Sequence, residues 1–291
     1  MTVPSVRLAA SAKVNLFLRI LAREEGGYHG VETLLCRVDL ADDLVAERVA
    51  GSGVSLEVSG GDAGPAEENL VVRAARLVLE ATGHRFGVRL SLTKSIPMRA
   101  GLGGGSSDGA AALVAVNRLA GDAVPRHELL QFAARLGSDV PFFLSGAALA
   151  LAWGHGERLV RLPPLPSLPG LLVLPTTEVS TAEAYAWLDE SRLTWERRGA
   201  VALDLEALAS WGSIGRMAGN DFEAVVFARL PEVKRAFEAL AATHPLLCRM
   251  SGSGSALFAL YRTARDRDDA RTMLGPKHGR VLPVGTLAGP V

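Results

Sequence analysis

The chain has 291 residues, of which 48% are hydrophobic and 21% are charged. This composition allows a sizeable core and excludes a disordered protein, and the length favours two domains or one large one. The 31 basic and 31 acidic residues give a formal net charge of zero. That balance argues against a nucleic-acid binder that depends on bulk positive charge, although a local basic patch stays possible.

Cysteine content and the first residues indicate the compartment. The two cysteines, Cys36 and Cys248, cannot form a disulfide framework, and nothing near them has the spacing of zinc ligands. The apolar stretch within Met1–Lys13 is interrupted by Arg7, which makes it too short for the core of a signal peptide. We therefore expect a cytoplasmic protein.

One uncharged run, Val140–Gly156, has the length to raise the question of a membrane segment. Pro141, Gly146 and Gly154 break it, so it is predicted as a buried strand, and we expect no membrane partner.

The secondary-structure pattern mixes strands and helices along the chain. Period-two alternation predicts strands at Val6–Ala10, Val14–Ile20, Leu44–Val49, Val54–Val58, Val88–Lys94, Leu171–Leu174, near Leu246, at Ala256–Tyr261 and near Val281. Helical patterns predict helices at Asn69–Thr82, Ser107–Leu119, Arg126–Leu136, Thr181–Leu188, Leu203–Trp211, Pro231–Thr243 and Asp266–Leu274. Because strands and helices do not alternate strictly, an α+β fold is favoured over a doubly wound sheet.

A single proline-dense stretch, Pro163–Gly170, marks a candidate domain junction. We therefore predict an N-terminal domain over residues 1–160 and a C-terminal domain over residues 161–291.

The segment Pro97–Asp108 is rich in glycine and serine, follows a predicted strand and opens a predicted helix. Free backbone amides and the helix dipole suit phosphate at such a place, and glycine allows the backbone to approach closely. A dinucleotide-binding fingerprint that started at Gly101 would need glycine where Ser106 stands, and the chain has no Gly-Lys pair for a P-loop. A phosphate site of another class is thus predicted, with a flexible linker or a tight turn as the alternative.

Six motifs in order resemble those of the GHMP small-molecule kinase superfamily. They are Lys13-Val-Asn15, Gly27-Tyr28-His29, Pro97–Asp108, Asp139–Phe143, Gly219–Glu223 and Met250–Ser255. The resemblance spans residues 8 to 258. It departs from the usual pattern at Arg99, where the superfamily has a small residue, and at Gly109, where it has alanine.

The resemblance implies a two-domain α+β kinase with its active site in the cleft between the domains. Lys-x-Asn, Gly-Tyr-His and Asp-Val-Pro-Phe-Phe resemble the branch that phosphorylates the 2-hydroxyl of a cytidine diphosphate derivative of methylerythritol, in the non-mevalonate synthesis of isoprenoid precursors. The cofactors would be ATP and Mg²⁺, with no Mg²⁺ ligand identified. The protein would be a monomer or a homodimer.

Residue roles follow from the same resemblance. Asp139 would accept the proton of the substrate hydroxyl or hold that hydroxyl in line, and Lys13 would stabilise charge at the attacking oxygen. The substrate would contact Asn15, Tyr28, His29 and Tyr185. ATP would contact Lys94, Pro97, Met98, Arg99, Ala100, Gly101, Leu102, Gly103, Gly104, Gly105, Ser106 and Ser107.

Several of these residues also have an ordinary structural interpretation. Asp139 could be a turn or helix-terminus aspartate, and Lys13 and Lys94 could be solvated at strand ends. Tyr185 could be a core tyrosine. Asn220, Asp221 and Glu223 are predicted to hold the start of a helix and not to bind metal. The Met250–Ser255 stretch is predicted to close over the site beside the first loop, with a simple turn as the alternative.

Two other functions remain open at this point. A different kinase of the superfamily, acting on mevalonate-type, homoserine-type or sugar substrates, would keep both glycine loops but would not need Gly-Tyr-His. A ligand-binding regulator on the same scaffold would bind nucleotide without turnover, and the presence of both Lys13 and Asp139 speaks against it.

Overall fold

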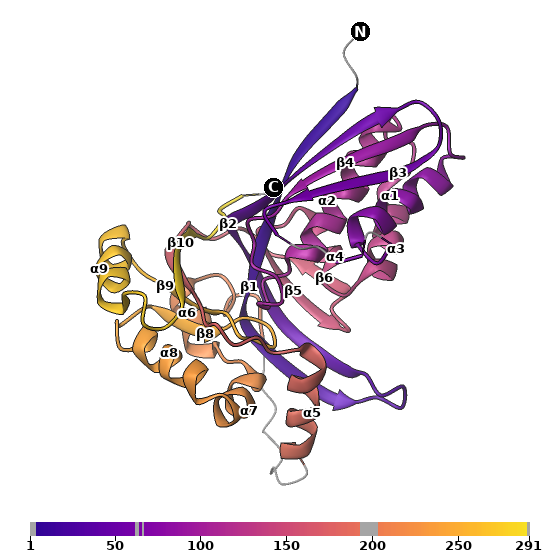
Figure 1. Ribbon diagram of the computed structural model, residues 1–291. Coiled ribbons are helices and arrows are strands. Elements are labelled where there is room, and N and C mark those ends of the chain that lie inside the picture. The colour runs from indigo at the N-terminus through magenta and orange to yellow at the C-terminus, as the bar shows by residue number, and fades with distance from the viewer. Residues whose placement is uncertain (1–3, 62–63, 66, 193–202, 290–291) are drawn as a thin grey trace.

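The computed structural model describes residues 4–61, 64–65, 67–192 and 203–289, and it contains two sheets that are covered by helices (Figure 1). Residues 1–3 of the segment that was examined for a signal peptide lie outside the described part. Both helices and sheets contribute to each half of the molecule, so the predicted α+β class is confirmed.

The first sheet has the strand order β3-β4-β2-β5-β6, and β1 pairs with β2 beside this path. Its strands are β1 (Ser5–Arg23), β2 (His29–Val49), β3 (Gly53–Ser59), β4 (Gly87–Thr93), β5 (Leu149–Gly154) and β6 (Arg158–Arg161). The β3–β4 pair is parallel and the other pairs are antiparallel. The strands β1 and β2 form one long antiparallel ribbon that extends toward the other half of the molecule (Figure 1).

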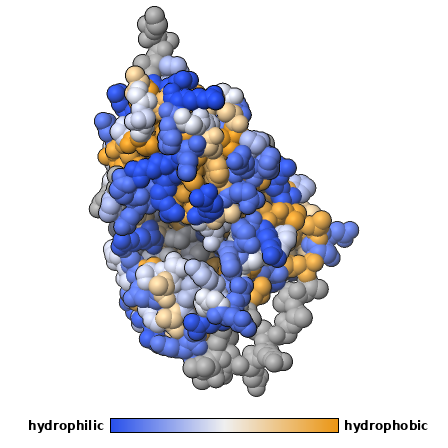
Figure 2. Space-filling view, turned by 90° about the vertical axis from the view of Figure 1, so that its right-hand side faces the viewer, coloured by the Kyte–Doolittle hydropathy of each residue, from blue (hydrophilic) through white to orange (hydrophobic). Residues whose placement is uncertain are grey.

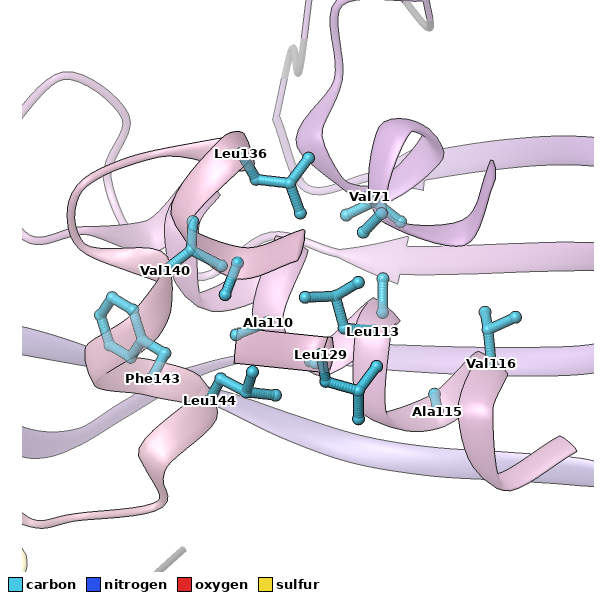
Figure 3. Close-up of a cluster of buried hydrophobic side chains, with 14 of the residues drawn as sticks. Val71, Ala110, Leu113, Ala115, Val116, Leu129, Leu136, Val140, Phe143 and Leu144 are labelled. Carbon is cyan, nitrogen blue, oxygen red and sulfur yellow. The ribbon is translucent and has the colours of Figure 1, made fainter. Parts of the chain in front are cut away.

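Four helices cover one face of this sheet. They are α1 (Leu70–Ala81), α2 (Gly104–Leu119), α3 (Arg126–Leu136) and α4 (Val140–Ser145). Figure 3 shows the apolar side chains that these helices direct toward one another, among them Val71, Leu113, Leu129 and Leu144. The alanine-rich face of α2 lets the neighbouring helices and the sheet approach closely.

The second sheet is antiparallel, with the order β10-β7-β9-β8. Its strands are β7 (Pro169–Leu174), β8 (Leu247–Met250), β9 (Leu257–Leu260) and β10 (Arg280–Gly285). The helices of this half are α5 (Thr181–Arg192), α6 (Trp211–Met217), α7 (Asp221–Arg229), α8 (Pro231–Ala241) and α9 (Ala264–Leu274). The first sheet ends at Arg161 and the second begins at Pro169. This gap supports the predicted division at residue 160, which stays a prediction.

An apolar cluster joins the two halves. Val14 and Leu16 of β1 share this cluster with Leu172 and Phe258 of the second sheet. Leu102 of the glycine-rich segment is buried in the same cluster. The junction between the halves is therefore packed, and it anchors the segment that carries the predicted phosphate site. On the face shown in Figure 2, hydrophilic residues lie across both halves with smaller hydrophobic groups between them.

Most predicted elements are confirmed within a few residues, and two are wrong. The run Val140–Gly156 is not one strand, because Pro141 lies in the first turn of the short helix α4 and Gly146, with φ of 73°, ends that helix before β5 begins. The predicted helix Leu203–Trp211 is also wrong, since α6 begins where it was expected to end. Ser210 caps α6 by accepting a hydrogen bond from the amide of Ser213.

Among the described residues, no helix is both long enough and apolar enough to cross a membrane.

Candidate active site

The glycine-rich segment forms a loop that leads directly into α2. Gly101 and Gly103 have φ of 75° and 71°, in the left-handed region that glycine adopts without strain. The turn at Gly103 lets α2 begin at Gly104, three residues before the predicted start. Because the first amides of a helix have no acceptor within it, those of Gly104, Gly105 and Ser106 are free to meet an anion.

A second glycine loop, at Met250–Ser255, packs against the first, as predicted. The hydroxyl of Ser251 donates to the carbonyl of Gly101 at 2.9 Å, and a Cβ on Gly101 would meet the Ser251 carbonyl oxygen at 2.1 Å. Asn220 caps α7 through the amide of Phe222 and also donates to the carbonyls of Met250 and Gly252. The prediction that Asn220 holds a helix start is therefore confirmed, and the same side chain also fixes the second loop.

The side chain of Lys94 lies between two carboxylates just before the glycine loop. Its ammonium donates to Asp42 Oδ2, and to Asp108 Oδ2 at 2.6 Å. All three side chains are at most 6% exposed, so the solvated strand end considered for Lys94 is wrong. Burial alone would lower the pKa of Lys94, but the two carboxylates outweigh it and raise that pKa. Burial raises the pKa of Asp108 to about 7, against the pull of Lys94.

Asp42 also holds the backbone where the loop begins. Its Oδ1 accepts hydrogen bonds from the amides of Ser95 and Ile96, at 2.5 and 2.8 Å. One carboxylate thus fixes both the turn and the ammonium next to it.

Lys13 and Asp139 meet on the opposite side of the glycine loop. Lys13 Nζ lies 3.5 Å from Asp139 Oδ2, with the lysine side chain 5% exposed and that of Asp139 33% exposed. Asp139 stands at the start of α4, yet its carboxylate makes no capping hydrogen bond to that helix. The carboxylate is therefore not used as a helix cap and instead faces Lys13 and the adjoining cavity.

Two hydrogen bonds hold Lys13, and two more hold Asn15, which binds its ammonium. Its backbone amide donates to the carbonyl of Leu102, at an irregularity in the pairing of β1 with β2. Its ammonium donates to Asn15 Oδ1 at 2.7 Å, and the same oxygen accepts from the amide of Gly252 at 2.9 Å. Thr33 in turn holds the Asn15 amide group at 2.8 Å. Asn15 therefore connects Lys13 to the second glycine loop.

The aromatic residues predicted for the substrate lie farther along β1 and β2. Tyr28 is 69% exposed, and its ring centroid lies 5.3 Å from that of His155. His29 is buried, and its ring stacks on Tyr185 at 5.0 Å with an angle of 20° between the planes. Tyr28 and Tyr185 are thus each paired with a histidine.

Two cavities meet at the glycine loop. One, of about 390 Å³, is lined by Asn69, Lys94, Asp108 and the segment 96–106. The other, of about 830 Å³, is lined by Lys13, Asn15, Tyr28, His29, Asp139, His155, Tyr185 and Asp189, among others. Gly101, Gly103 and Ser106 line both. Because the resemblance implies ATP at the first and the acceptor substrate at the second, they are named the nucleotide cavity and the acceptor cavity. Both have the size of small-molecule sites.

Two loop residues project differently from the rest. Ser107 is buried, and its hydroxyl donates to the carbonyl of Ser11 at 2.8 Å, so this group ties α2 to β1. Arg99 is 80% exposed and lies 3.7 Å from Glu178 of the other half of the molecule. Its side chain therefore extends toward the second half and does not fill the loop.

Sequence reasoning missed four polar residues of the site: Asp108, His155 and Asp189, which line these cavities, and Asp42, which binds Lys94 but does not line them. Asp42 and Asp108 complete the Lys94 network, and His155 and Asp189 contact Tyr28 and His29. Asp108 closes the glycine-rich motif, which could have drawn attention to it. The others lie on segments that are far away in the sequence, and no local spacing of residues marks them as part of the site.

Two protein-family models match this chain, one in each half of the molecule. The model of the GHMP kinases N-terminal domain matches residues 69–147, and that of the GHMP kinases C-terminal domain matches residues 204–281. These two spans contain the first glycine loop and the second one, respectively.

Curated relatives and a solved structure agree with the match to the GHMP kinase models. The 4-diphosphocytidyl-2-C-methyl-D-erythritol kinase of Solibacter usitatus is 41% identical over 90% of this chain and 83% of the relative. The enzyme of the same name from Pelotomaculum thermopropionicum is 42% identical over 86% of this chain and 87% of the relative. A crystal structure of 4-(cytidine 5'-diphospho)-2C-methyl-D-erythritol kinase matches with a TM-score of 0.81 and 39% identity, over 98% of this chain and 100% of the other. The chain therefore belongs to the GHMP kinase family.

Proposed function

We propose that this chain transfers the γ-phosphoryl group of ATP to the 2-hydroxyl group of 4-diphosphocytidyl-2-C-methyl-D-erythritol, in the non-mevalonate synthesis of isoprenoid precursors. The observation that carries the proposal is the Lys13–Asp139 pair, which lines the acceptor cavity where Lys13 packs beside Gly103 of the loop that both cavities share. The relatives of that name, at about 40% identity along most of the chain, support the choice of acceptor. The reaction would take place in the cytoplasm, on a monomer or a homodimer.

ATP would bind with its phosphates on the segment from Pro97 to Ser107. The free amides at the start of α2 would donate to phosphate oxygens, and the helix dipole would favour their negative charge. Lys94 lines this cavity, but two carboxylates already engage its ammonium. Its contribution to the nucleotide would therefore be to offset part of the negative charge of the two acids, which would otherwise repel phosphate more strongly.

Mg²⁺ would accompany the nucleotide. The described residues contain no cluster of three or more histidine, cysteine, aspartate or glutamate side chains that could hold a metal alone. Mg²⁺ commonly binds substrate phosphates with only one or two protein oxygens, so this donor set fits the ion. The hydroxyl of Ser106, which lines both cavities, would supply such an oxygen. The ion would neutralise part of the phosphate charge.

The acceptor would lie in the larger cavity with its cytidine end near Tyr28 and His29. Tyr28 offers an exposed ring on which a base can stack, and His29 offers a ring nitrogen to the edge of the base. Tyr185, which stacks on His29, would support that ring from behind. The methylerythritol end would then reach toward Asn15 and Asp139.

Phosphoryl transfer would proceed by in-line displacement. The 2-hydroxyl oxygen forms a bond to the γ-phosphorus, the bond from that phosphorus to the β,γ-bridging oxygen breaks, and ADP leaves. Asp139 accepts the hydroxyl proton, and the ammonium of Lys13 stabilises the charge that develops at the attacking oxygen. Asn15 keeps this ammonium in place through the 2.7 Å hydrogen bond.

A panel of acceptors tests this function. ADP release from ATP and Mg²⁺ is measured with 4-diphosphocytidyl-2-C-methyl-D-erythritol, mevalonate, homoserine and galactose. The proposal expects turnover with the cytidine compound alone. Turnover with another alcohol would retain the family and refute the assignment of Tyr28 and His29. Nucleotide binding without turnover of any acceptor would favour the ligand-binding regulator.

A further inference from the structure

Asp189, on α5, makes contacts that the reaction above does not use. Its Oδ1 lies 2.7 Å from Nε2 of His29, and its Oδ2 lies 3.7 Å from Nη1 of Arg23. All three residues line the acceptor cavity. The side chain of His29 is 5% exposed and that of Asp189 is 34% exposed, so the carboxylate meets the buried ring from the cavity side.

A carboxylate at hydrogen-bond distance determines which nitrogen of a neutral imidazole carries the hydrogen. An ionised carboxylate only accepts hydrogen bonds, so Nε2 of His29 must donate to Asp189. A neutral imidazole has a single N–H group, and Nδ1 is therefore left with a lone pair. Nδ1 makes no hydrogen bond within the described part of the chain and is not among its fully enclosed unpartnered atoms. It is thus accessible from the cavity.

The orientation of the ring is fixed as well as its tautomer. Tyr185 stacks on the His29 ring, and Phe222 meets Tyr185 edge-on with centroids 5.0 Å apart. Rotation of the imidazole by about 180°, which would put a ring carbon where each nitrogen now lies, would break the 2.7 Å contact with Asp189 and leave Nε2 unpaired. The cavity therefore presents a hydrogen-bond acceptor at a fixed place.

We propose that Asp189 is a positioning residue that makes His29 select cytosine over uracil; this inference rests on the proposed function. Cytosine carries an amino group at position 4, which donates to the lone pair on Nδ1 of His29. Uracil carries a carbonyl oxygen at that position. This oxygen is also an acceptor, so it forms no hydrogen bond with the lone pair on Nδ1. A site built to pair with a donor rejects an analogue that lacks it, because its own polar group is left unpaired.

Kinetic selectivity is the first test. The ratio of kcat/KM for the cytidine substrate to that for its uridine analogue is measured for the wild type and for Asp189→Asn. Asparagine can accept or donate, so it no longer specifies the tautomer. We expect the ratio to fall at least about tenfold, mainly through KM, and to recover in part in Asp189→Glu. A ratio in Asp189→Asn equal to that of the wild type would overturn the proposal.

Glu190→Gln is the matched control for this series. Glu190 lies next to Asp189 on α5, but its carboxylate is exposed, pairs with Arg229 and does not line the acceptor cavity. The control should keep the wild-type ratio. An equal fall in Glu190→Gln would show that loss of any acid on this helix has the same effect, and it would contradict a specific role for Asp189.

Two further measurements are made on the wild type and do not depend on turnover. Nitrogen-15 chemical shifts of the wild-type histidines, with His29 assigned by comparison with His29→Asn, should show hydrogen on Nε2 and not on Nδ1 at pH 8. Calorimetry should show tighter binding of CDP than of UDP. Hydrogen on Nδ1, or no preference for CDP, would overturn the proposal even if the wild type turns over the cytidine substrate. Absence of turnover together with both expected results would refute the proposed function alone.

Discussion

The nucleotide cavity and the acceptor cavity share three loop residues but are built by different means. The nucleotide cavity consists largely of backbone from the glycine-rich segment, supported by the buried Lys94 network. The acceptor cavity is formed by side chains, among them the exposed Tyr28 and the buried His29, from both halves of the molecule. Phosphate presents the same oxygens in every nucleotide, so backbone amides suffice to bind it. An acceptor substrate is distinguished from others by side chains that match its particular polar groups.

The buried network on the nucleotide side gives the largest expected effect on stability. Lys94→Met removes the cation between two buried carboxylates and leaves them facing each other. We expect the free energy of unfolding to fall by about 3–5 kcal/mol. Lys234→Met is the control, because Lys234 forms an exposed pair with Glu238 and its loss should cost less than about 0.5 kcal/mol. Denaturant unfolding of both variants measures the difference, and equal losses would contradict the account.

The contact between the two glycine loops gives the next largest effect. Gly101→Ala places a Cβ against the Ser251 carbonyl in a backbone with φ of 75°. We expect a loss of at least about 1–2 kcal/mol in the free energy of unfolding without ligand. Gly105→Ala is the matched control, because a Cβ there has open space within the helix, and alanine should leave stability unchanged or increase it. A thermal midpoint that is lowered equally in both variants would refute the role given to Gly101.

On the acceptor side, the exposed ring should matter for binding and not for folding. Tyr28→Ala removes a side chain that is 69% exposed, so thermal stability should stay unchanged. KM for the cytidine substrate should rise about tenfold through lost stacking, while KM for ATP stays the same. Tyr28→Phe keeps the ring and should stay near the wild type. A rise in KM for ATP in Tyr28→Ala would mean that the two cavities are not separate in function.

The last effect concerns the pH dependence of stability. Burial raises the pKa of Asp108 to about 7 in the folded protein, above its usual value. The folded state then binds more protons than the unfolded state, so this contribution to stability is fully present below pH 4 and is lost as the pH rises through 7. The free energy of unfolding of the wild type, relative to that of Asp108→Asn, should fall between pH 5 and 7, by at most about 1.4 kcal/mol per pH unit, and level off above pH 8. A difference between the wild type and Asp108→Asn that rises with increasing pH would contradict this prediction.

The same contrast explains what the sequence could predict. The glycine loop could be found because amides, turn and helix start lie within twelve consecutive residues, Pro97–Asp108. Helix α1 was found because Asn69 caps it and an apolar stripe follows. The run after Asp139 misled the prediction, because a short buried helix and a buried strand are equally uncharged.

Contacts between distant segments could not be predicted. Asp42 reaches Lys94 from β2, and Asp189 reaches His29 across 160 positions of sequence. Neither has a spacing that marks it, and both depend on how the sheet and α5 pack. The burial of Lys94 has the same origin, since its neighbours in sequence indicate only the end of a strand.

In the proposed mechanism the two cavities meet at the glycine loop, and Asp139 of the acceptor cavity acts on the reacting hydroxyl and contributes little to binding. Single-turnover transfer of the γ-phosphoryl group with both substrates saturating, together with the affinities for ATP and for the cytidine substrate, tests it in Asp139→Asn. Asp43→Asn, which removes an exposed partner of Arg7, is the control and should keep the wild-type rate. We predict a rate about 10²–10⁴-fold lower in Asp139→Asn with both affinities within threefold of the wild type. An unchanged rate, or a loss that arises from binding alone, would contradict the account.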